Sequence, residues 1–309
     1  MLIESPRSGR FSVANPLSFK TRRTLMPYAY IAPAMALFAV LMVAPITIVF
    51  YYSALDRAIL NPNPEFVGFR NFQTIFSDPV FWQSVLQTLY FTIMSVVFHL
   101  VIGLWFALML NSPRVFPPLR NLLRVIFILP WLFNAVIIAI LWRLMLDPNG
   151  IINNVLLAMS IVQSKIEWFS SPDTAIHALT FVNIWAGFPL YMVSLLAGLQ
   201  GVPKDLYEAA EMDGANGLQK LRYITLPQLK PIIISIALLD FIWTMQVFPL
   251  VWMTTGGGPI HATEMLSTYT YKLAFTRYQF SLAAASAVVI FVLSMSMTYL
   301  YIKHQKASR

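Results

Sequence analysis

The stretch Glu208-Ala-Ala-Glu-Met-Asp-Gly-Ala215 is a polar segment of small residues that separates two hydrophobic runs, each long enough to cross a lipid bilayer. Small side chains such as Ala209 and Ala210 are poor lipid anchors, but they permit close docking in a groove of another protein. The stretch has acidic as well as basic neighbours, unlike the basic helices that lie on membrane surfaces. We therefore expect a protein-docking element here, with a helix lying on lipid as the alternative.

Local signals around this stretch predict two short helices at a bend. Pro203 fits the start of a helix, and Asp205 would lie in its positively polarised first turn. Gly214 would end that helix, because a residue without Cβ adopts a backbone reversal at little cost. Asn216 and Gln219 have the spacing of a capping box, which predicts a second short helix before Pro227.

The composition places the chain in a membrane. Hydrophobic residues make up 58% of its 309 residues, charged residues 11%, and the mean hydropathy is +0.67. Such a chain has too little polar surface to cover a water-soluble globule of this size. It contains no cysteine, which excludes disulfides and thiolate sites, and its four histidines lack the spacing of a zinc helix.

Six apolar runs reach the length of about 20 residues that a membrane span requires. They lie at about 25–54, 85–110, 122–146, 175–199, 231–253 and 281–302. The sequence therefore predicts an all-α integral membrane protein with six transmembrane helices. Its expected parts are a basic cytoplasmic leader (1–24), the membrane domain (25–303) with a docking loop at 201–230, and a cytoplasmic tail (304–309).

The distribution of positive charge predicts the orientation of these spans. With the N-terminus inside, 15 of the 21 lysines and arginines fall in the cytoplasm and six fall outside. Cationic residues in short flanking loops resist translocation, so this asymmetry favours cytoplasmic termini. The six outer cations are Arg57, Arg70, Arg143, Lys165, Lys272 and Arg277. The basic residues form no single stripe, so we expect contact with anionic membrane lipid and none with nucleic acid.

One acid, Asp240, lies inside a predicted span, about 13 Å from its inner end at about 1.5 Å per residue. A carboxylate at that depth costs about 2.5 to 3.5 kcal/mol and should face a cavity or a partner. Trp243 and Gln246 follow on one side of the same helix, and these three groups suit the binding of a sugar. The alternative is that Asp240 bonds a neighbouring helix or a second subunit.

Weaker solute candidates are Asn183, Trp185 and Asn134, because single amides often link helices instead. For the same reason we expect His99 to form a helix–helix bond and not a proton relay. The glycines of Thr254-Thr-Gly-Gly-Gly-Pro259 predict a turn, since no phosphate-loop pattern accompanies them.

The sequence from Tyr207 to Pro231, YEAAEMDGANGLQKLRYITLPQLKP, resembles the signature loop of permease subunits in binding-protein-dependent ABC importers. Matches at 67–72 (VGFRNF), 183–185 (NIW), 199–203 (LQGVP) and 255–259 (TGGGP) are similar to the carbohydrate-type permeases of maltose, lactose and glycerol-3-phosphate importers. The resemblance covers about residues 25 to 303. Leu221 departs from the usual phenylalanine and Ser281 from the usual glycine.

The resemblance implies the six-helix architecture of a type I ABC importer permease in a bacterial-type inner membrane. Partners would be a second permease in a heterodimer, two cytoplasmic ATPases and an extracytoplasmic solute-binding protein. The chain would have no catalytic residue, metal or cofactor of its own, and ATP would bind the ATPases. Five residues would form the helix that couples to an ATPase: Glu208, Ala209, Ala210, Asp213 and Gly214.

The residues discriminate between three possible functions. A carbohydrate importer permease accounts for the signature loop, and solute import would proceed by alternating access. A secondary transporter or channel would need sites for coupling ions or a pore lined with charges. The predicted spans contain a single acid and show no inverted repeat, which argues against both. An intramembrane enzyme would need paired acids, a histidine cluster or a nucleophile motif, and none is found.

Overall fold

The computed structural model describes residues 19–113 and 115–307, and their regular secondary structure is helical, apart from one isolated β-bridge between Leu55 and Phe66. The all-α prediction is therefore confirmed. Most of the predicted leader and the last two residues of the predicted tail lie outside the described residues. Within the described part, helix α1 already begins at Phe19, and α14 continues to Ala307.

The chain divides into two compact units, residues 1–51 and 52–309. The described part of the first unit is one long helical stretch. It consists of α1 (Phe19–Phe38), a π-helical turn η1 (Ala39–Val43) and nearly all of α2 (Ala44–Ser53). Met26–Ser53 is long and apolar enough to span a membrane, and its side chains are largely exposed, as lipid-facing side chains are.

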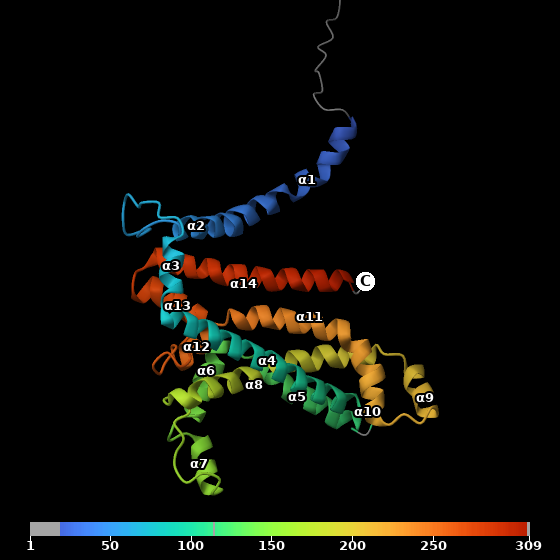
Figure 1. Ribbon diagram of the computed structural model, residues 1–309. Helices are drawn as coiled ribbons and strands as arrows, with labels where there is room; N and C mark the ends of the chain where they lie inside the picture. Colours follow the sequence, from blue (N-terminus) through green and yellow to red (C-terminus); the bar gives the residue numbers. More distant parts are fainter. Residues whose placement is uncertain (1–18, 114, 308–309) are drawn as a thin grey trace, which may run out of the picture. The chain divides into compact units, whose positions relative to one another are not determined.

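The second unit is built around two long helices, α4 and α8, which pack along each other and are flanked by α5 and α11 (Figure 1). Asp78 caps the N-terminus of α4 through Val80 N at 2.9 Å, and proline occupies the first turn of both α4 and α8. The elements of this unit are α3 (Arg70–Phe76), α4 (Pro79–Asn111), α5 (Pro117–Leu132), α6 (Ala135–Met145), α7 (Ile151–Ala158), α8 (Pro172–Gln200), α9 (Lys204–Met212), α10 (Gly217–Lys220), η2 (Leu221–Thr225), α11 (Leu226–Met245), α12 (Pro249–Thr254), α13 (Leu266–Tyr271), η3 (Lys272–Thr276) and α14 (Phe280–Ala307).

A close approach of α4 and α8 depends on Gly187. A Cβ built on this residue would lie 2.3 Å from Cε1 and Nε2 of the His99 ring. No side chain fits there without moving the imidazole, so the glycine lets His99 lie against the α8 backbone. This contact positions the buried polar cluster described below.

Five helical stretches of the described chain are long and apolar enough to span a membrane, and a bent pair makes a sixth. The expectation of one continuous third helix at 122–146 is wrong: α5 ends at Leu132, α6 begins at Ala135, and the two meet at 99°. Phe133 and Asn134 adopt extended conformations, and the Asn134 side chain caps α6 by accepting a hydrogen bond from Val136 N at 2.9 Å. Asn134 therefore has a local structural role as a helix cap.

The fifth span also differs from its expected range. It starts at Gly217, because α10 continues through η2 into α11, and it ends at Met245, because Pro249 begins the separate helix α12. The second helix of the docking loop is thus the first turn of a membrane span and not an independent short helix. This continuity fixes the docking loop directly to α11.

Candidate functional site

The two short helices of the docking loop, α9 and α10, lie at one end of the second unit, and α3, α12 and α13 lie at the opposite end (Figure 1). The five residues expected to couple to an ATPase lie on α9 and the turn after it, where four are exposed and Ala210 is half-buried. Met212 is 88% exposed and Leu218 72% exposed. A polar turn that presents apolar side chains to solvent has the surface character of a docking element.

The bend between α9 and α10 is fixed by its own backbone and side chains. Gly214 N donates to Glu211 O at 3.0 Å and Ala215 N donates to Ala210 O at 2.8 Å, the two bonds of a Schellman motif. Gly214 has a φ of +76°, the left-handed conformation that this motif requires. The predicted helix end at Gly214 is confirmed.

The predicted capping box that starts α10 is also confirmed. Gln219 N donates to Asn216 Oδ1 at 3.0 Å, and Asn216 N donates to Gln219 Oε1 at 2.7 Å. Two further contacts tie α9 to the start of the fifth span. Tyr207 Oη lies 2.9 Å from Thr225 Oγ1, and Lys220 Nζ lies 2.6 Å from Glu211 Oε1.

A buried polar cluster surrounds Asp240 in the membrane part of the second unit. Asp240 Oδ2 lies 2.8 Å from His99 Nδ1 and accepts from Tyr191 Oη at 2.9 Å, while Oδ1 accepts from Thr244 Oγ1 at 2.9 Å. His99 Nε2 lies 3.0 Å from the Asn183 carbonyl oxygen. Both ring nitrogens of His99 thus face oxygen atoms, and a ring nitrogen that carries a hydrogen donates it to its partner. The cluster thereby joins α4, α8 and α11.

This geometry matches the helix-linking alternative for Asp240, whose two oxygens are both occupied by groups of this chain. It also supplies the helix–helix bond expected of His99. The sequence alone did not identify Tyr191 and Thr244 as partners of Asp240. Their signals were weak, because Thr244 is one helical turn from Asp240 but Tyr191 lies on another helix.

None of the remaining solute candidates forms a hydrogen bond with Asp240 itself. Asn183 Nδ2 donates to Ser95 Oγ at 2.9 Å, and the backbone carbonyl oxygen of Asn183 lies 3.0 Å from His99 Nε2. Trp185 packs edge-to-face on Trp142 with ring centroids 5.3 Å apart. Gln246 Nε2 donates to Ser294 Oγ of α14 at 3.1 Å, while Trp243 is 58% exposed. The structure brings Asn183 to Asp240 through His99, and their contact with solute stays a prediction.

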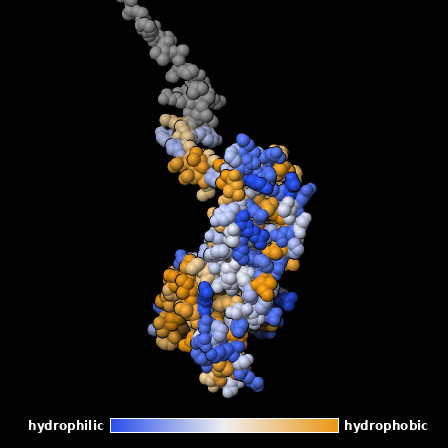
Figure 2. All heavy atoms as spheres, turned by 90° about the vertical axis from the view of Figure 1, so that its left-hand side faces the viewer, coloured by the Kyte–Doolittle hydropathy of each residue, from blue (hydrophilic) through white to orange (hydrophobic). Residues whose placement is uncertain are grey.

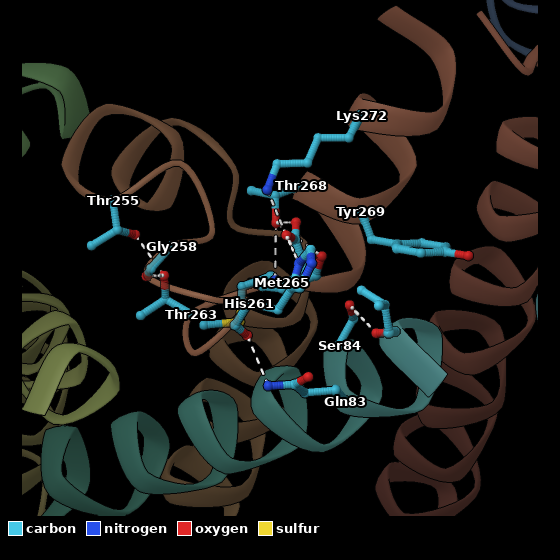
Figure 3. A network of polar contacts seen from close by, with 12 residues as sticks. Gln83, Ser84, Thr255, Gly258, His261, Thr263, Met265, Thr268, Tyr269 and Lys272 are labelled. Carbon is cyan, nitrogen blue, oxygen red and sulfur yellow. Dashed lines mark hydrogen bonds and ion pairs between the residues drawn. The ribbon is translucent and has the colours of Figure 1, made fainter. Parts of the chain in front are cut away.

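A second buried carboxylate, Glu264, lies beside Gly257 of the glycine-rich turn. Figure 3 shows the residues around it, among them His261, Thr268 and Lys272. Glu264 forms an ion pair with Lys272, accepts from Thr268 Oγ1 at 2.8 Å and lies 3.0 Å from His261 Nδ1. The turn itself is closed by Thr263 Oγ1, which donates to the Gly258 oxygen at 2.6 Å. This network holds the loop before α13 and accounts for the turn expected at these glycines.

Tyr269 links the same region to the start of α4. Its hydroxyl donates to Asp78 Oδ2 at 2.8 Å, and burial together with this bond raises the pKa of the Tyr269 hydroxyl. The phenol therefore remains a donor at any physiological pH. Nowhere in the described ranges do three or more His, Cys, Asp or Glu side chains form a cluster able to hold a metal ion.

The chain is similar in sequence to a known protein family and to permease proteins of sugar transport systems. Residues 100–305 match the family described as binding-protein-dependent transport system inner membrane component. The chain is 34% identical over 288 residues to the trehalose/maltose transport system permease protein MalF of Thermococcus litoralis, which covers 92% of this chain and 95% of that protein. It is 32% identical over 253 residues to the lactose transport system permease protein LacF of Rhizobium radiobacter, with 80% and 83% covered.

The fold is shared with a solved transporter. A crystal structure of a bacterial ABC transporter involved in the import of the acidic polysaccharide alginate contains a chain that superposes with a TM-score of 0.79. The superposition covers 93% of this chain and 97% of that chain, at 23% sequence identity. At this identity the likeness establishes the common fold.

Proposed function

Because this chain belongs to the family of binding-protein-dependent transport system inner membrane components, we propose that it forms half of the pathway through which an ATP-driven importer moves a sugar or sugar-like solute. The chain is a multi-pass membrane protein and a transport subunit. The observation that carries the proposal is the exposed turn of α9 and α10, locked by a Schellman motif and a capping box at one end of the helical bundle.

In this proposal the turn seats in a cleft of a cytoplasmic ATPase through Glu208, Ala209, Ala210, Asp213 and Gly214. A second, different permease completes the pathway, and its own turn engages a second ATPase. The chain binds no cofactor, and ATP binds and is hydrolysed on the partner subunits. Closure of the two ATPases draws the paired turns together and rocks the helices between inward-open and outward-open states.

The direct join between α10, η2 and α11 supports this transmission. A displacement of the turn is passed to a membrane span through a continuous helical stretch and not through a flexible loop. The names of the relatives, which include trehalose/maltose and lactose permeases, support a carbohydrate as the solute. Family membership favours this function over a secondary transporter or channel.

Reconstitution tests the proposal. The chain is placed in proteoliposomes with its second permease, the ATPases and a solute-binding protein, and uptake of labelled trehalose, maltose and lactose is measured. We expect vanadate-sensitive uptake of at least one sugar that stops when any one component is omitted. Uptake that needs an ion gradient and no ATPase would instead establish a secondary transporter.

The orientation is part of the proposal, with both termini in the cytoplasm of a bacterial-type cell. It is supported by the 15 to 6 division of cations and by the C-terminal end of α14, which lies at the same end of the unit as α9 (Figure 1). We expect reporter fusions after Lys220 to be cytoplasmic, and fusions after Asn63 and Glu264 to be outside. Opposite locations at two of these sites would overturn the six-span arrangement.

A further inference from the structure

The end of the second unit that carries α3, α12 and α13 has a hydrophilic surface. Figure 2 faces this end and shows hydrophilic residues gathered over much of it. A cavity of about 870 Å³ opens there between the segment after α2 and the start of α14. In the proposed orientation this cavity is extracytoplasmic.

Three arginines, Arg57, Arg70 and Arg277, line this cavity together with one acid, Asp56. Two positive charges are therefore in excess. All three arginines are exposed, and the structure gives their guanidinium groups no hydrogen bond or ion pair to any described residue. A single charge at a protein surface can pair with any nearby ion. Three guanidinium groups without a partner around one cavity together attract a negatively charged group into that cavity.

The walls of the cavity are tied together by buried hydrogen bonds. Ala58 N donates to Ser281 Oγ at 2.8 Å, which joins the segment after α2 to the start of α14. Asn71 Nδ2 donates to the carbonyl oxygens of Ser53 and Leu55 at 2.8 and 2.9 Å, which holds the same segment on α3. The cavity is thus formed before any ligand binds, and its charges need little reorganisation.

The backbone on both sides of the cavity is held in conformations that side chains rarely adopt. Arg57 and Tyr278, from opposite walls, have φ values of +48° and +57°. Such residues persist where the surrounding structure over-determines them, and they concentrate at functional sites. Here they keep Arg57 and the residue after Arg277 at the rim of the same hollow.

We propose that this cavity, which we call the arginine pocket (Arg57, Arg70 and Arg277), receives acidic side chains of the solute-binding protein when that protein docks on the permease. The inference rests on the proposed function. Arginine binds carboxylate in a bidentate geometry, and a cavity of this size admits several side chains. Since the guanidinium groups are exposed, the pocket contributes more to the rate and selection of docking than to a deeply buried bond.

The test measures how much binding protein is needed to stimulate ATP hydrolysis. The complete complex is placed in nanodiscs of phosphatidylcholine, and the binding protein that stimulates the wild-type complex is titrated against it at about 20 mM and about 500 mM salt. The variant combines Arg57→Gln, Arg70→Gln and Arg277→Gln. The matched control is Arg143→Gln, another outer arginine that is exposed but does not line the pocket.

We expect the triple variant to raise the half-saturating concentration of binding protein about tenfold at low salt and little at high salt, because screening removes the same attraction in the wild type. The control should leave the value unchanged. Correct assembly of the variant is checked by co-purification of the ATPases. An unchanged half-saturation at low salt, or an equal effect of Arg143→Gln, would overturn the proposal.

The outcome for the proposed function is separate. If the wild-type complex responds to a binding protein and the triple variant responds equally, the arginine pocket is rejected and the importer function stands. If no binding protein stimulates the wild-type complex, the importer function falls, and the pocket proposal falls with it.

Discussion

Replacing Gly214 with valine is expected to abolish transport while the chain still inserts into the membrane. Gly214 forms the left-handed turn of the Schellman motif, with a φ of +76°. A side chain in that region costs roughly 1–2 kcal/mol, and a β-branched one is a pronounced outlier. The turn is small and exposed, so it relaxes to another conformation, and the coupling residues on α9 then no longer match an ATPase cleft.

Gly217 provides a matched control for this prediction. A Cβ on either glycine would meet nothing within 4 Å, but Gly217 is not in the left-handed region. Gly217→Val therefore adds the same bulk to the same surface without backbone strain, and Gly214→Asn keeps a residue that tolerates the left-handed turn. Transport assays and ATPase co-purification should show loss in Gly214→Val and retention in the other two. Wild-type transport by Gly214→Val would reject the role of the turn.

The details of this turn were predictable from the sequence because they are local. A Schellman motif and a capping box each involve residues within five positions of one another, and Gly214, Asn216 and Gln219 carry both signals. The continuation of α10 into α11 was not evident. Pro227 looked like the end of a helix, but it lies in the first turn of α11, which follows the π-helical turn η2.

The bend between α5 and α6 shows where hydropathy fails. Residues 125–142 are apolar except for Asn134, and an apolar run does not record whether its helix is straight. The bend is set by two extended residues and by the Asn134 cap. Pro130 and Asn134 were the available signals, but an asparagine within an apolar run suggests a helix link as readily as a cap.

Contacts between segments that are distant in the sequence could not be predicted from it. Leu266 N of α13, for example, donates to Thr88 Oγ1 of α4 at 2.9 Å, although the two residues are 178 positions apart in the sequence. The intramembrane cluster likewise joins positions 99, 191 and 240 from three helices. Their pairing depends on how α4, α8 and α11 pack, which the spacing of residues along one helix does not specify.

Asp240→Asn is expected to lower the stability of the assembled complex and leave sugar preference unchanged. Asp240 Oδ2 is shared by His99 and Tyr191, and Oδ1 accepts from Thr244; an asparagine in its place has an uncharged oxygen and an amide group that donates where a carboxylate oxygen now accepts. Removing one partner of a buried charge pair strands the other and costs about 3 to 5 kcal/mol. The thermal unfolding midpoint of the complex should fall, and the solute concentration for half-maximal uptake should stay the same.

Trp243→Ala serves as the comparison on the same helix. Trp243 is 58% exposed in the isolated chain, so its loss should change the unfolding midpoint much less than Asp240→Asn does. If Trp243 stacks on a sugar, Trp243→Ala should raise the half-saturating concentration for that sugar. A stability effect confined to Asp240 and a solute effect confined to Trp243 would assign the two residues to different tasks.

A double replacement then separates a helix clamp from a solute contact at Asp240. If the carboxylate serves chiefly to satisfy His99, replacing both residues by leucine removes both members of the buried pair together, and such a replacement can restore much of the stability lost in either single variant. Uptake of the native sugar should recover with it. If Asp240 instead binds the sugar, the double variant would regain stability but not uptake, and Asp240→Asn alone would shift the half-saturating sugar concentration. That second pattern would contradict the clamp, because a residue that only joins α4, α8 and α11 has no contact through which to recognise a solute.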